Sequence, residues 1–199
     1  MARPDLPAEL PSFCGHTLNL NGALVRNQSA KLRKGTSEHK GFLIRKHLLK
    51  AEKSDIVFLQ ETHWAAVPDA VGFLRNFKGQ TRGVAFSDQR GKRGVATLIP
   101  RGSPLYNCTT DLSKCPQGRW ALIRIDAKND FMHVVNFYCP AEESDRPAFF
   151  NELMTKFTGY HNLVFVGDWN FVECTMDKLT LNGQPKSVAG PKAHYWVLT

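Results

Sequence analysis

The sequence predicts an α/β fold, in which strands form sheets that helices cover. The chain has 199 residues, 42% of them hydrophobic, which is enough for one substantial domain with an apolar core. Strand-like and helix-like segments alternate in its first half and again near its end. Between these regions, segments at residues 94–99, 120–126 and 133–138 are strand-like and have no helix between them. Part of the sheet is therefore expected to be antiparallel.

The first third of the chain predicts a strand, a loop, a helix and a second strand. Residues 16–20 form a short strand-like segment that ends at an Asn-Gly turn signal. The basic and polar residues 23–36 are expected to form a loop. A helix capped by Ser37 is expected through about Lys53, because its apolar residues recur with helical spacing. Residues 55–59 then read as a buried strand.

The rest of the chain predicts further strands and one more helix. The expected strands lie at residues 83–86, 94–99, 120–126, 133–138 and 163–166, and the expected helix runs from residue 146 to residue 157. After Asp177 the pattern gives way to Lys, Thr, Gly and Pro. No internal repeat and no low-complexity segment interrupts this order.

The charge balance favours a polyanionic partner. The formal net charge is +8 and the sequence pI is about 9.4, so nucleic acid is favoured over an acidic membrane surface. Residues 23–55 contain nine Lys or Arg and three Asp or Glu. A solvated helix face would explain that excess equally well. If the segment does bind substrate, the candidate contacts are Arg26, Lys31, Arg33 and Lys34.

The cysteines and the N-terminus exclude several classes of protein. Five cysteines, an odd number without a CxxC pair, indicate neither a disulfide framework nor a structural zinc site. Reduced thiols in an intracellular protein are the expectation. No run approaches the ~18 apolar residues of a membrane-spanning helix. Residues 1–14 are rich in proline and lack the apolar core of a signal peptide, so they are expected to be a lead-in.

Polar side chains stand at the ends of four predicted strands. They are Asn19 and Asn21, Glu61, Tyr138, and the pair Asp168 and Asn170. Because sites gather at the carboxyl ends of strands in α/β sheets, these groups are candidates for one pocket. Carboxylates and amides suit a hard cation such as Mg²⁺, which also binds water and substrate phosphate.

Each of these residues also has a structural explanation. Gly-Asp-x-Asn at residues 167–170 and Asn-Gly at residues 21–22 are turn formers. Glu61 can be a helix cap or a surface charge. Tyr138 can be a core residue whose hydroxyl is hydrogen-bonded.

Five segments in order resemble the endonuclease/exonuclease/phosphatase superfamily. They are LNLNG, DIVFLQETHW, RGVATLIP, NFYCPAE and VFVGDWNFVE. The set is most similar to the apurinic-like endonuclease domain that opens the second reading frame of many non-LTR retrotransposons. The resemblance spans about residues 15–180. It implies a DNase I-like, four-layer α/β/β/α sandwich, with residues 15–199 forming an incomplete domain that is truncated at its C-terminus.

The resemblance also implies roles for the strand-end residues. Glu61 would be the main metal ligand, with Asn19 and Asn21 at the same metal site. Tyr138 would contact the scissile phosphate. Asp168 would orient or deprotonate the attacking water, and Asn170 would donate hydrogen bonds to the phosphoryl oxygens.

The cofactor and partners follow from the same resemblance. The metal would be Mg²⁺, with Mn²⁺ as a possible substitute. The substrate would be DNA, and a downstream reverse transcriptase domain of the same polyprotein would be a partner. No membrane is involved, and the location would be intracellular, or nuclear for a retrotransposon-derived protein.

The sequence departs from the superfamily pattern in two main places. Ala141 stands where members usually carry Asn after Tyr-x-Pro, which removes one donor. The closing Ser-Asp-His triplet is absent, and His194 lies in a different context, AHYWVLT. Lys178, where Arg is usual after Asp177, is a milder change.

These departures leave three functional hypotheses open. The first is a metal-dependent endonuclease that nicks DNA and is impaired in this chain. The second is a catalytically dead relic that binds nucleic acid through its basic surface. The third is a phosphatase of the same superfamily. Little or no activity is expected of the 199 residues alone, because catalytic groups that act as a unit lose most of their effect when one is missing.

Overall fold

The computed structural model describes residues 6–20, 54–63, 81–89 and 92–170, and of residues 81–89 it describes only the backbone. By its contacts the chain divides into two compact units, Met1–Trp169 and Asn170–Thr199. The fold below is that of the first unit. The loop and helix predicted over residues 23–53 lie outside the described residues. No helix within the described ranges is long and apolar enough to cross a membrane.

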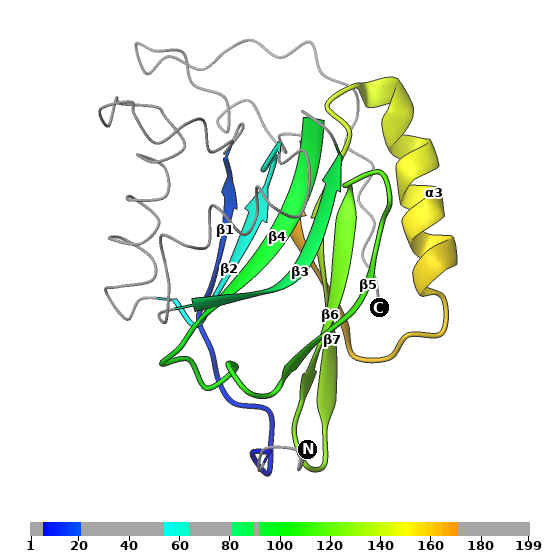
Figure 1. The fold of residues 1–199 in the computed structure, drawn as a ribbon. Helices are drawn as coiled ribbons and strands as arrows, with labels where there is room; N and C mark the ends of the chain where they lie inside the picture. The colour runs from blue at the N-terminus through cyan, green and yellow to red at the C-terminus, as the bar shows by residue number, and fades with distance from the viewer. Residues whose placement is uncertain (1–5, 21–53, 64–80, 90–91, 171–199) are drawn as a thin grey trace, which may run out of the picture. The chain divides into compact units, whose positions relative to one another are not determined.

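Two four-stranded sheets pack face to face (Figure 1). The first contains, in spatial order, β1 (Gly15–Asn19), β2 (Ile56–Gln60), β4 (Lys92–Pro100) and β3 (Thr81–Gln89). The second contains β5 (Thr109–Lys114), β6 (Trp120–Asp126), β7 (Phe131–Tyr138) and β8 (Leu163–Asp168). The pairs β1–β2 and β7–β8 are parallel, and all other pairs are antiparallel. The predicted mixture of parallel and antiparallel strands is therefore confirmed.

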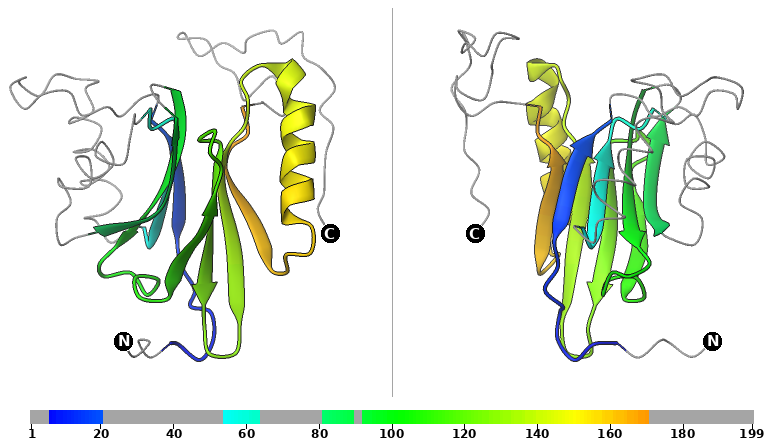
Figure 2. Two further views of the ribbon diagram at one scale, coloured as in Figure 1. Left: turned by 45° about the vertical axis from the view of Figure 1, so that its right-hand side comes forward. Right: turned by 90° about the vertical axis from the view of Figure 1, so that its left-hand side faces the viewer.

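Helix α3 (Arg146–Phe157) covers the outer face of the second sheet (Figure 2). A short 3₁₀ helix, η2 (Glu143–Asp145), precedes it, and Pro147 lies in its first turn, where a missing N–H costs nothing. Phe149, Leu153 and Phe157 are its buried residues, and their spacing of four gives one apolar face. These side chains pack on the outward-facing residues of β6 and β7, among them Leu122 and Phe137.

Strand alternation divides the second sheet between two apolar cores. In β6, Ala121, Ile123 and Ile125 face the first sheet, whereas Trp120 and Leu122 face α3. The core between the sheets is completed by residues such as Ile56, Phe58, Val95 and Ile99. Because both faces of β6 are covered at its start, its first four residues, WALI, form a continuous apolar run.

The structure confirms every predicted strand and the predicted helix at residues 146–157 within the described ranges. It also contains one strand that was not predicted, β5, with the sequence TTDLSK. This strand lies at a sheet edge, most of its residues are exposed, and its register shifts between Asp111 and Ser113. An edge strand of this kind lacks the apolar alternation by which strands are recognised.

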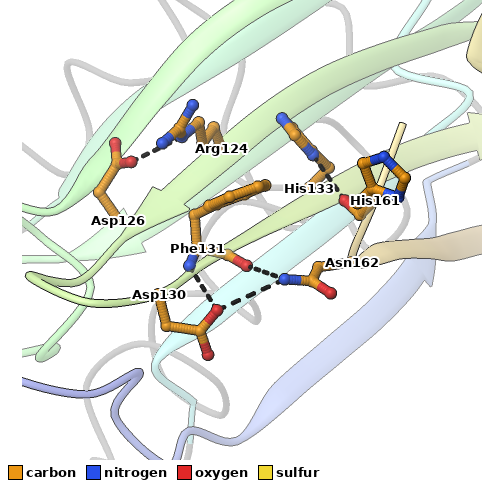
Figure 3. Close-up of polar contacts among 7 residues, drawn as sticks. All are labelled: Arg124, Asp126, Asp130, Phe131, His133, His161 and Asn162. Atoms are coloured by element: carbon orange, nitrogen blue, oxygen red, sulfur yellow. Dashed lines mark hydrogen bonds and ion pairs between the residues drawn. The ribbon is translucent and has the colours of Figure 1, made fainter. Parts of the chain in front are cut away.

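A cluster of polar contacts joins the residues just before β8 to the start of β7 (Figure 3). The Asn162 side chain donates to the Asp130 carboxylate at 3.4 Å and to the Phe131 carbonyl at 3.0 Å. His133 Nδ1–H donates to the His161 carbonyl at 2.9 Å. The parallel register then pairs His133 with Leu163 and, five residues later, Tyr138 with Asp168. Contacts at one end of the sheet thus determine which residues meet at the other.

One buried amide links the two sheets. Asn136 of β7 is 1% exposed, and its side chain donates to the carbonyls of Leu59 at 3.3 Å and Ala96 at 2.9 Å in the first sheet. Its carbonyl oxygen accepts from Gln60 Nε2 at 2.8 Å, and Gln60 Oε1 accepts from the Thr17 hydroxyl at 3.0 Å. This chain of hydrogen bonds crosses from the second sheet to the edge strand of the first.

Replacing Asn136 by alanine is expected to lower the free energy of unfolding by about 2–4 kcal/mol. The change leaves the buried Gln60 amide without its acceptor and removes one hydrogen bond from each of the Leu59 and Ala96 carbonyls. A buried polar group left unsatisfied costs about 1–3 kcal/mol, and the alanine also leaves a cavity. Urea unfolding followed by circular dichroism measures the change. Asn129→Ala, at an exposed position, is the matched control and should stay within ~0.5 kcal/mol of the wild type. Equal losses in the two variants would contradict the bridging role.

Candidate active site

The end of β2 turns sharply and presents Glu61. Gln60 is the last strand residue, and Glu61 follows it with a φ of 51°, in the left-handed region. His63 and Arg93 have φ values of 54° and 59°. This conformation is unfavourable by about 1–2 kcal/mol per residue for an L-amino acid with a side chain. Left-handed residues of this kind gather at functional sites.

Tyr138 holds the Glu61 carboxylate. Tyr138 ends β7, and its hydroxyl donates a hydrogen bond to Glu61 Oε1 across the space between the sheets. The Tyr138 backbone N–H donates to the Arg119 carbonyl at 2.7 Å, and the Arg119 guanidinium carbon lies 5.3 Å from the centre of the tyrosine ring. Tyr138 is therefore fixed at its backbone, its ring and its hydroxyl.

A second polar pair joins the outer strands of the two sheets. Asn19 Nδ2, at the end of β1, donates to Asp168 Oδ2, at the end of β8, over 2.7 Å. The donated hydrogen bond orients the Asp168 carboxylate.

Gly167 allows Asp168 to reach this position. A Cβ atom at residue 167 would lie 1.9 Å from the Phe137 carbonyl oxygen, so no other residue fits without movement of the backbone. The close approach brings β8 against the last residues of β7. The Cys139 N–H then donates to the Asp168 carbonyl at 2.8 Å, which fixes the backbone that carries the carboxylate.

Four of the predicted site residues thus come from four strands in two sheets. Asn19 pairs with Asp168, and Tyr138 pairs with Glu61. Between the strands that carry them runs the hydrogen-bond chain of Thr17, Gln60 and Asn136. Asn170 begins the second unit with a φ of 52°. The other candidates, Asn21, Arg26, Lys31, Arg33 and Lys34, lie outside the described residues.

Beside Glu61 and Tyr138 lies a pocket of about 300 Å³. Its lining includes His63, which the sequence favours as a structural residue, and three cationic side chains that were not predicted, Lys92, Arg93 and Arg119. Acidic residues Glu142 and Asp145 and the small residue Ala141 also line it. Each missed arginine stands next to a glycine at the start of a strand, in Arg93-Gly94 and Gly118-Arg119. A basic residue beside a turn glycine is the local signal that could have identified them.

Burial changes the acid–base behaviour of two residues near this pocket. It lowers the pKa of Arg119, and repulsion from Arg93 lowers that pKa further. Burial also raises the pKa of the Cys139 thiol to about 11. Cys139 is therefore a protonated, inert thiol at neutral pH rather than a nucleophile.

The oxygen-rich side chains suit a magnesium ion better than a transition metal. Among the described residues no three His, Cys, Asp or Glu side chains cluster as metal ligands. Mg²⁺ needs no such cluster, because it commonly takes one or two carboxylates and fills its remaining positions with water and substrate phosphate. The chemistry of Glu61, Asp168 and the Asn19 amide fits that preference.

Trp169 supports the site by packing. Its ring stacks on Phe150 with centroids 5.9 Å apart and meets Phe137 edge to face at 4.6 Å. The residue after Asp168 is thereby anchored to α3 and β7.

Stability is expected to fall between about pH 9 and pH 11 through Cys139. The thiol ionises near pH 9.0 in the unfolded chain but near pH 11 in the folded one. In that window the folded state holds a proton that the unfolded state has lost, so raising the pH favours unfolding. Urea unfolding at pH 8, 9.5 and 10.5 should show a smaller pH-dependent loss for Cys139→Ala than for the wild type. Cys14→Ala, which removes an exposed thiol, is the matched control, and identical profiles for all three proteins would refute the assignment.

No protein-family model matches the sequence, and no curated protein sequence matches it significantly. The structure, however, is similar to solved structures of other proteins. The AP endonuclease LMAP from Leishmania major is 16% identical over 82% of this chain and 57% of that chain, with a TM-score of 0.57. A humanized D. rerio TDP2 carrying 14 mutations is 14% identical over 79% of this chain, with a TM-score of 0.53.

The match covers 62% of that TDP2 chain, so this chain spans roughly three fifths of the length of both proteins. The endonuclease domain of TRAS1, a telomere-specific non-LTR retrotransposon, matches with 15% identity over 79% of this chain and 60% of that chain. Its TM-score of 0.47 is below the level that establishes a shared fold. The two stronger likenesses confirm the predicted fold class: this chain has a DNase I-like α/β fold.

Proposed function

We propose that this chain is a metal-dependent phosphodiesterase of the nuclease type that nicks DNA. The observation that carries the proposal is the meeting of two polar pairs, Asn19–Asp168 and Glu61–Tyr138, at strand ends from both sheets. Hydrolysis of a phosphodiester needs an oriented water, a proton acceptor and hydrogen-bond donors for the phosphoryl oxygens. These four residues supply the acceptor and part of the donor set.

In this proposal Asp168 orients the attacking water and accepts its proton. The hydrogen bond from Asn19 Nδ2 to Asp168 Oδ2 holds the carboxylate in one orientation. Tyr138 would contact the scissile phosphate through its hydroxyl, the group that donates to Glu61 Oε1 in the structure. Asn170, two residues beyond Asp168, would donate to a phosphoryl oxygen. Such fixed donors stabilise charge that develops in the transition state.

Glu61, with Asn19 or Asn21, would hold the metal ion. A bound Mg²⁺, or Mn²⁺ in its place, would neutralise charge on the phosphate as a Lewis acid. The hydrogen bond from Tyr138 holds the Glu61 carboxylate toward the space between the sheets. A metal ion bound there would lie close to a phosphate that Tyr138 contacts.

The net charge of +8 supports DNA as the substrate, with Arg26, Lys31, Arg33 and Lys34 as further contacts. A downstream reverse transcriptase partner and a nuclear location belong to the retrotransposon hypothesis. The dead relic that only binds nucleic acid and the superfamily phosphatase are the competing functions. A cleavage assay with DNA separates all three.

Conversion of supercoiled plasmid to the nicked form in the presence of MgCl₂ tests the role of Asp168. We expect weak nicking by the 199-residue chain and a further loss of about 10²–10⁴-fold in Asp168→Asn, the usual contribution of a general base. Glu152→Gln, an exposed carboxylate on α3, is the matched control and should keep the wild-type rate. An equal nicking rate in Asp168→Asn would refute the proposed role. Nicking that is fast in the wild type would show that the absence of a Ser-Asp-His triplet from these 199 residues matters less than expected.

Titration with Mg²⁺ tests the metal site separately from cleavage. We expect the wild-type chain to bind Mg²⁺ detectably by isothermal titration calorimetry, and Glu61→Gln to lose that binding, because a neutral amide is a poorer ligand for a hard cation. Glu152→Gln again serves as the control. Equal heats for Glu61→Gln and the wild type would place the metal elsewhere.

A further inference from the structure

Backbone hydrogen bonds connect the start of β4 in the first sheet with the turn before β6 in the second sheet, close to Tyr138. The His63 N–H donates to the Arg93 carbonyl at 2.8 Å, and the Gly94 N–H donates to the Gly118 carbonyl at 2.9 Å. The first bond joins the end of β2 to the start of β4, and the second joins β4 to the residue before Arg119. These backbone bonds hold Arg93 and Arg119 at the lining of one pocket.

The two arginines are held there at an energetic cost. Arg93 has a φ of 59°, a conformation that glycine or asparagine would adopt more readily. Arg119 is partly buried, and both burial and the nearby Arg93 charge lower its pKa. Two like charges at one pocket repel each other unless an anion lies between them.

The described residues offer these cations no direct ion pair. The one ion pair among them joins Arg124 and Asp126, at the other end of β6. Glu142 and Asp145 also line the pocket, but both are exposed to water, and Asp145 acts on Arg119 only as a more distant charge. Arg119 Nη1 donates to the Tyr138 carbonyl at 3.4 Å, which accounts for one of its five N–H donors. Among the described residues, no other acceptor is bonded to the Arg119 side chain, and its remaining N–H groups suit an anionic ligand.

We propose that this pocket binds the phosphate next to the scissile phosphate on the same polynucleotide strand, with Arg93 and Arg119 as its ligands and Lys92 and His63 at its rim. The proposal rests on the proposed function, because the same pocket is lined by Tyr138, which would contact the scissile phosphate, and by Glu61, which would hold the metal ion. Guanidinium groups bind phosphate oxygens in pairs of parallel hydrogen bonds, which fixes the position of the phosphate. The substrate would then be a strand with at least two neighbouring phosphates, rather than a phosphomonoester.

Salt-dependent DNA binding tests this subsite without relying on cleavage. The affinity for a duplex oligonucleotide is measured by fluorescence anisotropy without Mg²⁺ at several salt concentrations, for the wild type, Arg93→Gln, Arg93→Lys and the control Lys128→Gln. Lys128 is exposed in the turn between β6 and β7, at the opposite end of β7 from Tyr138. Circular dichroism melting of each variant shows that the fold is retained.

Arg93→Gln is expected to weaken binding about tenfold at low salt, the loss of one charge-assisted contact. The slope of log affinity against log salt should become shallower by about 0.9, the value for one phosphate on duplex DNA. Arg93→Lys should keep the slope and lose part of the affinity, and Lys128→Gln should match the wild type.

The outcomes distinguish the subsite from the proposed function. An unchanged slope in Arg93→Gln, equal losses in Arg93→Gln and Lys128→Gln, or no DNA binding by the wild type would overturn the subsite even if plasmid nicking depends on Asp168. Arg93-dependent binding that persists when nicking does not depend on Asp168 would support the subsite and overturn the proposed cleavage. Binding to phosphatidylglycerol vesicles is measured for the same variants. Arg93-dependent binding that is stronger to the vesicles than to DNA would overturn the assignment of the pocket to a polynucleotide phosphate.

Discussion

The hydrogen bonds of the buried Asn136 amide are the constraint on which the rest of the structure depends. Two apolar sheet faces can slide over one another with little change in buried area, because the hydrophobic effect has no direction. A buried amide removes that freedom, since its three hydrogen bonds to Leu59, Ala96 and Gln60 are satisfied in only one alignment. The alignment brings Tyr138, two residues further along β7, opposite Glu61.

The space between the sheets changes character along its length. Away from the site it is filled by aliphatic side chains such as Ile123, Ile125 and Ile99. Toward the strand ends the amides of Gln60 and Asn136 take their place, and beyond them come the carboxylates. Carboxylates could not be carried by the apolar part, because an unpaired buried charge costs far more than the packing it would gain. The polar layer is thus a transition between a dry core and a site that faces water.

Much of this arrangement follows from local sequence. The runs IVFL, VVNFY and LVFV are strands because of their composition, and the polar residues after them mark where each strand ends. The pairing of Asn19 with Asp168 was not predictable in the same way, because 149 residues separate them and their contact depends on how two sheets stack. Arg93 and Arg119 were missed for a related reason. Their turns read as ordinary surface loops, and only the bond between Gly94 and Gly118 brings them together.

The contacts at the start of β8 fix how far along β7 its last residue lies. Asn162 and His161, which directly precede β8, are hydrogen-bonded to β7, and Asp168 lies six residues beyond Asn162. Because side chains alternate across a sheet, one inserted or deleted residue would turn the carboxylate to the opposite face and move Gly167 away from its contact with Phe137. The position of Asp168 therefore tolerates substitutions within β8 better than insertions or deletions there. Changes of length are better tolerated in the loops between strands, which do not set the register of the sheet.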